Sequence, residues 1–140
     1  MEEKNKNSEK IFDLLNVRSP NWEAVKPLLK LPFNPKFKKF SETLLHVTVQ
    51  CGGVPEVVKT LLDAGADIHE KDAREWNTLH FAVQHGGNSE VVKMLIDAGA
   101  DVNEKTSEGR NPLQLAVQHA IQHGGVPEVL NILIEAGARF

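Results

Sequence analysis

Residues 77–103 read NTLHFAVQHGGNSEVVKMLIDAGADVN, and this stretch predicts two short helices joined by a turn. In the first helix, Leu79, Ala82 and Val83 recur at helical spacing, so they share one apolar face. The Gly-Gly pair that follows ends this helix, and Asn88 and Ser89 are both residue types that can cap the start of the next. The stretch therefore begins with an amphipathic helix and a turn.

The second half of the stretch has an apolar stripe of its own. The stripe consists of Val91, Val92, Leu95 and Ile96. Gly99 then suits the left-handed conformation that ends many helices. A single helix pair of this size cannot bury both stripes, so we expect neighbouring copies to stack.

The same unit occurs three times in the chain. The Leu-His pair at 79–80 has counterparts at 45–46 and 113–114, 34 residues earlier and later, and the last counterpart reads Leu-Gln. The closing tripeptide Ala-Gly-Ala stands at 64–66, 98–100 and 136–138. The glycine pair of the third unit comes four residues late, so we expect a lengthened first helix there.

A period of about 33 residues with a Thr-Pro-Leu-His-type start resembles the ankyrin repeat. The starts read TLLH at 43–46, NTLH at 77–80 and NPLQ at 111–114, and the Gly-Ala-Asp-Val-Asn common in that family is complete at 99–103. The resemblance implies an all-α, ankyrin-repeat helical solenoid with projecting finger loops. We expect one domain over 1–140, divided into a degenerate N-terminal capping repeat (8–41) and repeats at 42–75, 76–109 and 110–140.

Composition narrows the function classes. The net charge of −3 argues against nucleic acid as the main partner. No apolar run approaches the ~20 residues that span a membrane, so no membrane partner is expected. A single cysteine, Cys51, suits a reducing compartment, and we expect a cytoplasmic protein. A nuclear protein or an effector delivered into a host cell would look alike.

Irregularities concentrate in the N-terminal third. We expect residues 1–7 to be frayed, Ser8 to cap a short helix, and Pro27 to shorten or kink the helix around it. Residues 31–41 read as a loop with three phenylalanines, Phe33, Phe37 and Phe40. These rings tuck under the stack or form a contact patch; burial is the commoner fate of large apolar side chains.

The finger before the second repeat start carries a local conflict. Gly109 stands two residues before Asn111, where ankyrin fingers usually place a glycine, but Glu75 replaces it before Asn77. A left-handed conformation at Glu75 would cost about 1 kcal/mol. We therefore expect this finger to be remodelled.

The candidate chemical groups favour structural roles. His46 and His80 fill the repeat's Thr-Pro-Leu-His slot, where a histidine is expected to tie turn to helix. His119 and His123 lie four apart, a spacing that lets two imidazoles share an ion, but no third ligand accompanies them. Cys51 has no placed base beside it. We expect no catalytic residue, no metal site and no cofactor, and no enzyme activity.

The resemblance implies a protein–protein interaction module that binds a protein partner through a concave face of fingers and first helices. The expected contact residues are Phe40, Glu42, Gln50, Cys51, Lys71, Arg74, Trp76, Gln84, His85, Lys105, Glu108, Arg110, Gln118 and His119. Trp76 is expected to project from a finger tip beside Arg74 as a binding hot spot, or else to fold back over its neighbours. Basic residues outnumber acidic ones in this set, which favours an acidic partner surface.

Two further hypotheses accompany this one. The chain is expected to act as an adaptor or inhibitor, most simply as a monomer; the alternative is a structural or self-assembling unit that dimerises through its apolar C-terminal edge. Asn103 lies in a sequence that resembles those hydroxylated by asparaginyl hydroxylases acting on ankyrin repeats. The favoured interpretation is that Asn103 bonds the neighbouring turn.

Overall fold

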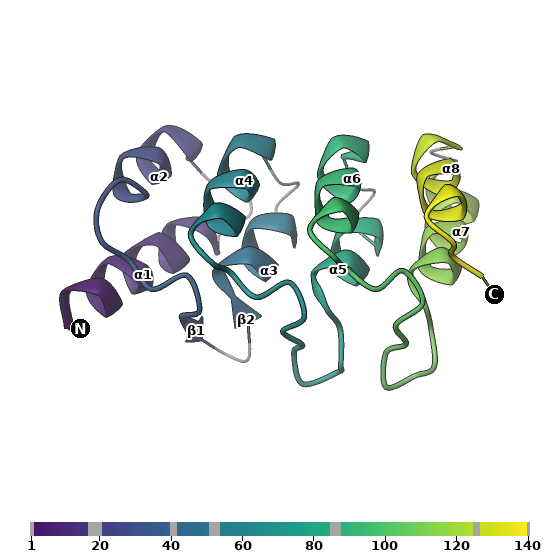
Figure 1. The fold of residues 1–140 in the computed structure, drawn as a ribbon, viewed down its shortest axis with the longest axis horizontal. Helices are drawn as coiled ribbons and strands as arrows, with labels where there is room; N and C mark the ends of the chain where they lie inside the picture. Colours follow the sequence, from purple (N-terminus) through teal and green to yellow (C-terminus); the bar gives the residue numbers. More distant parts are fainter. Residues whose placement is uncertain are drawn as a thin grey trace.

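The computed structural model describes residues 2–16, 21–39, 42–50, 54–84, 88–124 and 127–139. Helix pairs stand side by side in one row, with the two termini at opposite ends (Figure 1). The helices are α1 (Glu2–Leu15), α2 (Trp22–Leu28), α3 (Leu44–Gln50), α4 (Pro55–Asp63), α5 (Thr78–Gln84), α6 (Ser89–Asp97), α7 (Pro112–His123) and α8 (Pro127–Glu135). Within the described residues, two short strands, β1 (Lys38–Lys39) and β2 (Glu42–Thr43), accompany the helices, and the fold is the predicted all-α solenoid.

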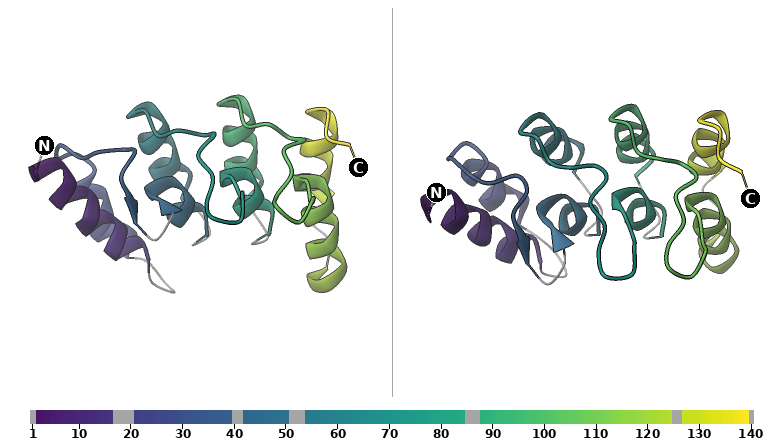
Figure 2. Two further views of the ribbon diagram at one scale, coloured as in Figure 1. Left: turned by 90° about the horizontal axis from the view of Figure 1, so that it is seen from below. Right: turned by 60° about the horizontal axis from the view of Figure 1, so that its bottom comes forward.

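Figure 2 shows a layer of first helices (α3, α5, α7) beside a layer of second helices (α4, α6, α8). One hydrophobic core cluster takes residues from both layers and from α1 and α2. Leu79 is fully buried, and Ala82 and Val83 are each 2% exposed, so the predicted face of α5 is confirmed. Asn88 caps α6 by accepting a hydrogen bond from the Glu90 amide at 2.9 Å. The apolar spacing and the cap thus account for each helix pair.

The third pair differs in length, as predicted. Helix α7 has 12 residues, whereas α3 and α5 have 7 each. Its last turns extend beyond the ends of the other first helices (Figure 2). This extension lies at the C-terminal end of the row.

The N-terminal pair corrects two expectations. Helix α1 already begins at Glu2, and Ser8 lies buried within it rather than at its cap. The Ser8 hydroxyl donates to the Lys4 carbonyl at 2.7 Å and accepts from the Asn34 amide at 2.6 Å. A serine that satisfies the carbonyl one turn back can stay inside a helix. The bond to Asn34 ties α1 to the loop that follows α2. Helix α2 itself ends at Leu28, one residue after Pro27.

The described residues after α2, 29–39 and 42–43, belong to the first finger, which includes a strand pair. Lys38 pairs with Thr43 and Lys39 with Glu42 in antiparallel register, which the sequence analysis did not predict. Phe33 and Phe37 pack against the core, and the Phe37 ring lies edge-on to Phe12 with centroids 6.2 Å apart. These two rings therefore tuck under the stack; Phe40 lies outside the described residues.

The second finger (residues 64–77) and the third finger (residues 98–111) share one backbone conformation. Glu75 has φ +60° and Gly109 has φ +78°. Each donates its amide three residues back, Glu75 to Asp72 at 3.0 Å and Gly109 to Thr106 at 2.9 Å. The expected remodelling is therefore wrong: Glu75 adopts the left-handed conformation, and the finger's other contacts outweigh the strain.

Two reciprocal substitutions test this strain. Glu75→Gly should raise the free energy of unfolding by about 1 kcal/mol, because glycine adopts positive φ without a steric penalty. Gly109→Glu should lower it by a similar amount; a Cβ at Gly109 would meet no atom within 4 Å, so strain is the only steric cost. Chemical denaturation of both variants gives the two changes. If both substitutions changed the free energy of unfolding by the same amount in the same direction, residues 75 and 109 would not share one conformation.

Candidate functional site

Histidines at the repeat starts hold the fingers in place. His80 Nδ1 accepts from the Asn77 amide at 3.0 Å, and Nε2 bonds the Glu104 carbonyl of the next finger at 2.8 Å. This pattern requires a neutral ring with its proton on Nε2, because Nδ1 is an acceptor. His46 makes the same two bonds, to Thr43 at 3.3 Å and to Glu70 at 2.9 Å. The expected tie between turn and helix is confirmed, and it reaches the adjacent repeat as well.

In the third repeat, Gln114 replaces the histidine. Its Oε1 accepts from the Asn111 amide at 3.0 Å, while the Asn111 side chain accepts from the Gln114 amide at 2.9 Å. The amide oxygen thus takes over the acceptor role of Nδ1. This natural replacement identifies glutamine as a non-titrating substitute for histidine at the slot.

A pH dependence follows from the burial of His80. Burial lowers the pKa of His80 from its ordinary value of 6.5, against the opposing effect of its bond to the Glu104 carbonyl. The unfolded chain therefore binds more protons than the folded one as the pH drops below about 6.5. The contribution of neutral His80 to the free energy of unfolding is therefore fully present above about pH 6.5. It is lost as the pH falls toward the pKa of His80 in the folded state.

We predict that His80→Gln flattens this dependence. Denaturation midpoints of the wild type should decline between about pH 7 and pH 5. Those of His80→Gln should decline less, because glutamine keeps the acceptor but cannot be protonated. Parallel curves for the two proteins would show that His80 is not responsible.

The described contact residues form a surface that we call the finger face: the second and third fingers and the exposed sides of α5 and α7. Lys71 on the second finger pairs with the Glu104 carboxylate on the third, which raises the pKa of Lys71. The Arg74 carbonyl accepts from the Ser107 amide at 3.0 Å. The two fingers are therefore held together as one surface.

Arg74 has the most defined environment on this face. Its guanidinium lies over the Trp76 ring, with Cζ 4.6 Å from the centroid, and its Nη2 is 3.3 Å from Asp72 Oδ2. The other Asp72 oxygen accepts from the Arg74 amide at 2.8 Å and the Trp76 amide at 3.0 Å. Sequence reasoning missed Asp72, although an aspartate that bonds the amide two residues on is a recognised turn signal.

Trp76 does not project, and this part of the expectation is wrong. Its side chain belongs to the core with 7% exposure, and its ring lies 5.4 Å from Phe81 and 6.0 Å from His80. It folds back over its neighbours, the alternative that the sequence left open, although the left-handed Glu75 is retained. Its Nε1 has no hydrogen-bond partner among the described residues. The ring therefore serves as the platform for Arg74.

Burial predicts the effect of removing this ring. Trp76→Ala should lower the free energy of unfolding by about 3–5 kcal/mol, as expected for a buried aromatic side chain. Arg74→Ala, which leaves the ring in place, should cost less than about 1 kcal/mol at this exposed position. Urea denaturation of both variants separates the two roles. A midpoint unchanged by Trp76→Ala would contradict its place in the core.

The remaining expected contact residues divide by what surrounds them. Lys105, Glu108 and Arg110 are exposed on the third finger, and Arg110 Nη1 donates to Gln118 Oε1 at 2.9 Å. Gln50 and Gln84 are half-buried at the ends of α3 and α5. His119 stacks on His123 with ring centroids 4.6 Å apart. Phe40, Cys51 and His85 lie outside the described residues, as does the side chain of Glu42.

Asn103 occupies the junction with the C-terminal turn. Its Nδ2 donates to the Gly137 carbonyl at 3.2 Å, and its Oδ1 accepts from the Arg139 amide at 3.0 Å. The expected bond to the neighbouring turn is confirmed. Both polar atoms of the amide are thus engaged within the fold.

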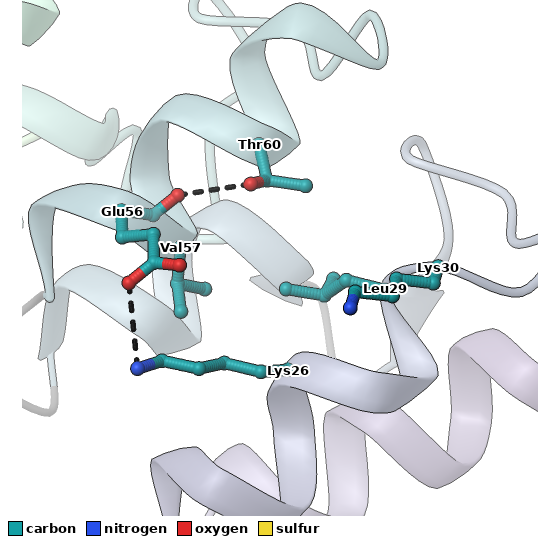
Figure 3. A pocket seen from close by; sticks show the side chains of 6 residues that line it. All are labelled: Lys26, Leu29, Lys30, Glu56, Val57 and Thr60. Carbon is teal, nitrogen blue, oxygen red and sulfur yellow. Dashed lines mark hydrogen bonds and ion pairs between the residues drawn. The ribbon is translucent and has the colours of Figure 1, made fainter.

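A small hollow between α2 and α4 lies away from the finger face (Figure 3). Its volume is about 110 Å³, and Lys26 crosses its edge to bond Glu56 at 3.3 Å. Small-molecule sites usually measure about 300–1,000 Å³, so this hollow is a seam between repeats. Across the described ranges, no group of three or more His, Cys, Asp or Glu residues is placed to hold a metal ion. In the same ranges, no helix is both long and apolar enough to cross a membrane.

Comparison with known proteins agrees with this geometry. The family model "Ankyrin repeats (3 copies)" matches residues 14–106 and 45–140. The chain belongs to the ankyrin-repeat family. Ankyrin repeats are generally protein–protein interaction modules, and they are typically non-catalytic. No match was found among curated proteins.

Proposed function

We propose that this ankyrin-repeat protein binds an acidic protein partner through the finger face and performs no chemistry of its own. The observation that carries the proposal is that contacts with Asp72 and Trp76 hold the Arg74 side chain in one position. Its guanidinium is exposed, yet Asp72 and the Trp76 ring fix its position, so little side-chain entropy remains to be lost on binding. A positioned arginine can bond a carboxylate through two parallel N–H donors.

Fewer basic side chains on the finger face carry an unbalanced charge than the sequence suggests. Glu104 offsets the charge of Lys71, and Asp72 offsets part of that of Arg74. Lys105 and Arg110 are exposed, and Arg110 bonds a neutral glutamine. The partner's acidic groups are therefore expected opposite Arg74, Lys105 and Arg110. A protein that covers a partner's surface without altering it chemically would act as an adaptor or an inhibitor. A cytoplasmic location suits the single cysteine.

The test begins with affinity capture on the immobilised chain, followed by measured affinities for each captured protein. Arg74→Glu should weaken binding of the relevant partner by about 2 kcal/mol or more, and the wild-type affinity should decline as salt rises. Arg74→Lys should recover only part of the loss, because lysine keeps the charge but not the planar fork.

Lys93→Glu is the matched control. Lys93 is exposed on α6, in the layer of second helices, so the same charge reversal lies off the finger face. Equal losses from the two reversals would indicate a general electrostatic effect and contradict this site. Self-assembly, the alternative expected from the sequence, is supported by different residues, those of α7 and α8.

A further inference from the structure

The C-terminal end of the row leaves a stacking surface uncovered. In α5, His80 and Val83 face the next repeat: His80 bonds the following finger, and Val83 is only 2% exposed. Gln114 and Val117 hold the same positions in α7, 34 residues later, and both are only half-buried. Ile121 has no counterpart, because α5 ends at Gln84, and it is 80% exposed.

Helix α8 continues this surface. Val92 and Ile96 of α6 recur 38 residues later as Leu130 and Ile134. Val92 is fully buried and Leu130 is half-buried; Ile96 is half-buried and Ile134 is 57% exposed. We call the combined surface the end face; it consists of Gln114, Val117, Gln118, Ile121 and Gln122 on α7 with Leu130 and Ile134 on α8. The five α7 residues line a shallow hollow of about 380 Å³.

The charge of the two ends of the row decides what can cover the end face. None of the seven residues of the end face is ionisable. At the other end, the hollow on α1 is lined by Leu14 and four charged side chains, Lys6, Glu9, Lys10 and Asp13, of which Glu9 and Asp13 pair with Lys39 of the first finger. Stacking that end on Ile121 and Val117 would bury these charges without new partners, which costs several kcal/mol. Contact between two end faces buries no ionisable side chain of the seven residues themselves; the Arg110 guanidinium, which bonds Gln118 at 2.9 Å, comes from the exposed third finger.

We propose that the end face binds the end face of a second copy, with the two α7 helices antiparallel across a twofold axis. Val117 and Ile121 form one row along α7 at i, i+4 spacing, and the three glutamines form a second row beside it. A twofold axis perpendicular to the helices keeps each row opposite itself. Val117 then meets Ile121 of the partner copy, and amide meets amide.

The glutamine row is complementary to itself. Each carboxamide carries two donors and one acceptor oxygen, so facing glutamines can bond reciprocally. Gln118 accepts from Arg110, which leaves its own N–H groups available to the other copy. The parallel arrangement would instead set the glutamine row against Val117 and Ile121.

Sedimentation of the full chain over micromolar to millimolar concentrations tests the assembly. The wild-type mass should rise from 15.5 kDa toward twice that value. Ile121→Glu should weaken dimerisation at least about tenfold, because it places a carboxylate in an uncharged contact. Since Ile121 is 80% exposed, the substitution leaves the fold of the monomer intact.

Leu31→Glu provides the matched control, because Leu31 is also exposed, at 46%, but lies in the first finger. It should dimerise like the wild type. A wild type that stays monomeric throughout the range, or equal weakening by both substitutions, would overturn the proposal.

The orientation is tested by cross-linking in a Cys51→Ser background. Gln118 lies at the middle of the glutamine row, so Gln118→Cys should form a disulfide with its own mate on oxidation. Gln114→Cys should not, because antiparallel packing sets Gln114 opposite Gln122 and separates the two copies of position 114 by about 12 Å along the helix. Cross-linking at position 114 as efficient as that at position 118 would overturn the antiparallel assignment.

Discussion

The hydrogen bond from a buried histidine to the next finger is the constraint on which the rest of the row depends. His46 and His80 each cap their own helix and then bond the carbonyl of Glu70 or Glu104 in the following finger. The same two glutamates are also held through their carboxylates, by Lys38 and Lys71 of the preceding finger. The second and third fingers are therefore each fixed at one residue by two bonds, a partly buried one from the histidine and an exposed one from the lysine. The exposed ion pairs add little stability, so the histidine supplies most of the register.

This constraint explains why so much of the fold is readable in the sequence. The Leu-His pairs, the apolar stripe of α5 and the capping Asn88 are all local signals, and each lies where the spacing predicts. The lengthened α7 was also predicted, because a late glycine pair has a direct structural meaning. In a repeat protein each repeat contacts mainly its neighbours. Few contacts between distant parts of the chain therefore have to be inferred from the sequence.

The sequence predictions that proved wrong depend on contacts between distant parts of the chain. Ser8 looks like a helix cap until Asn34, 26 residues away, provides its second partner. Trp76 looks exposed because its finger position usually is, but Phe81 and His80 offer its ring a place in the core. The basic appearance of the finger face also changed, since the pairing of Lys71 with Glu104 depends on how two fingers align. Glu75 shows the reverse case: the local strain was correctly anticipated, but its consequence was not.

The hydrogen bond between Arg110 and Gln118 joins two surfaces of the molecule. Arg110 stands on the third finger, and Gln118 belongs to the end of the row, so a contact on either side acts on the same pair of atoms. Thermodynamic linkage then requires reciprocity: whatever one contact does to the free energy of the other, the second does to the first by the same amount. Any contact at one surface that breaks or strengthens this 2.9 Å bond therefore changes the free energy of a contact at the other.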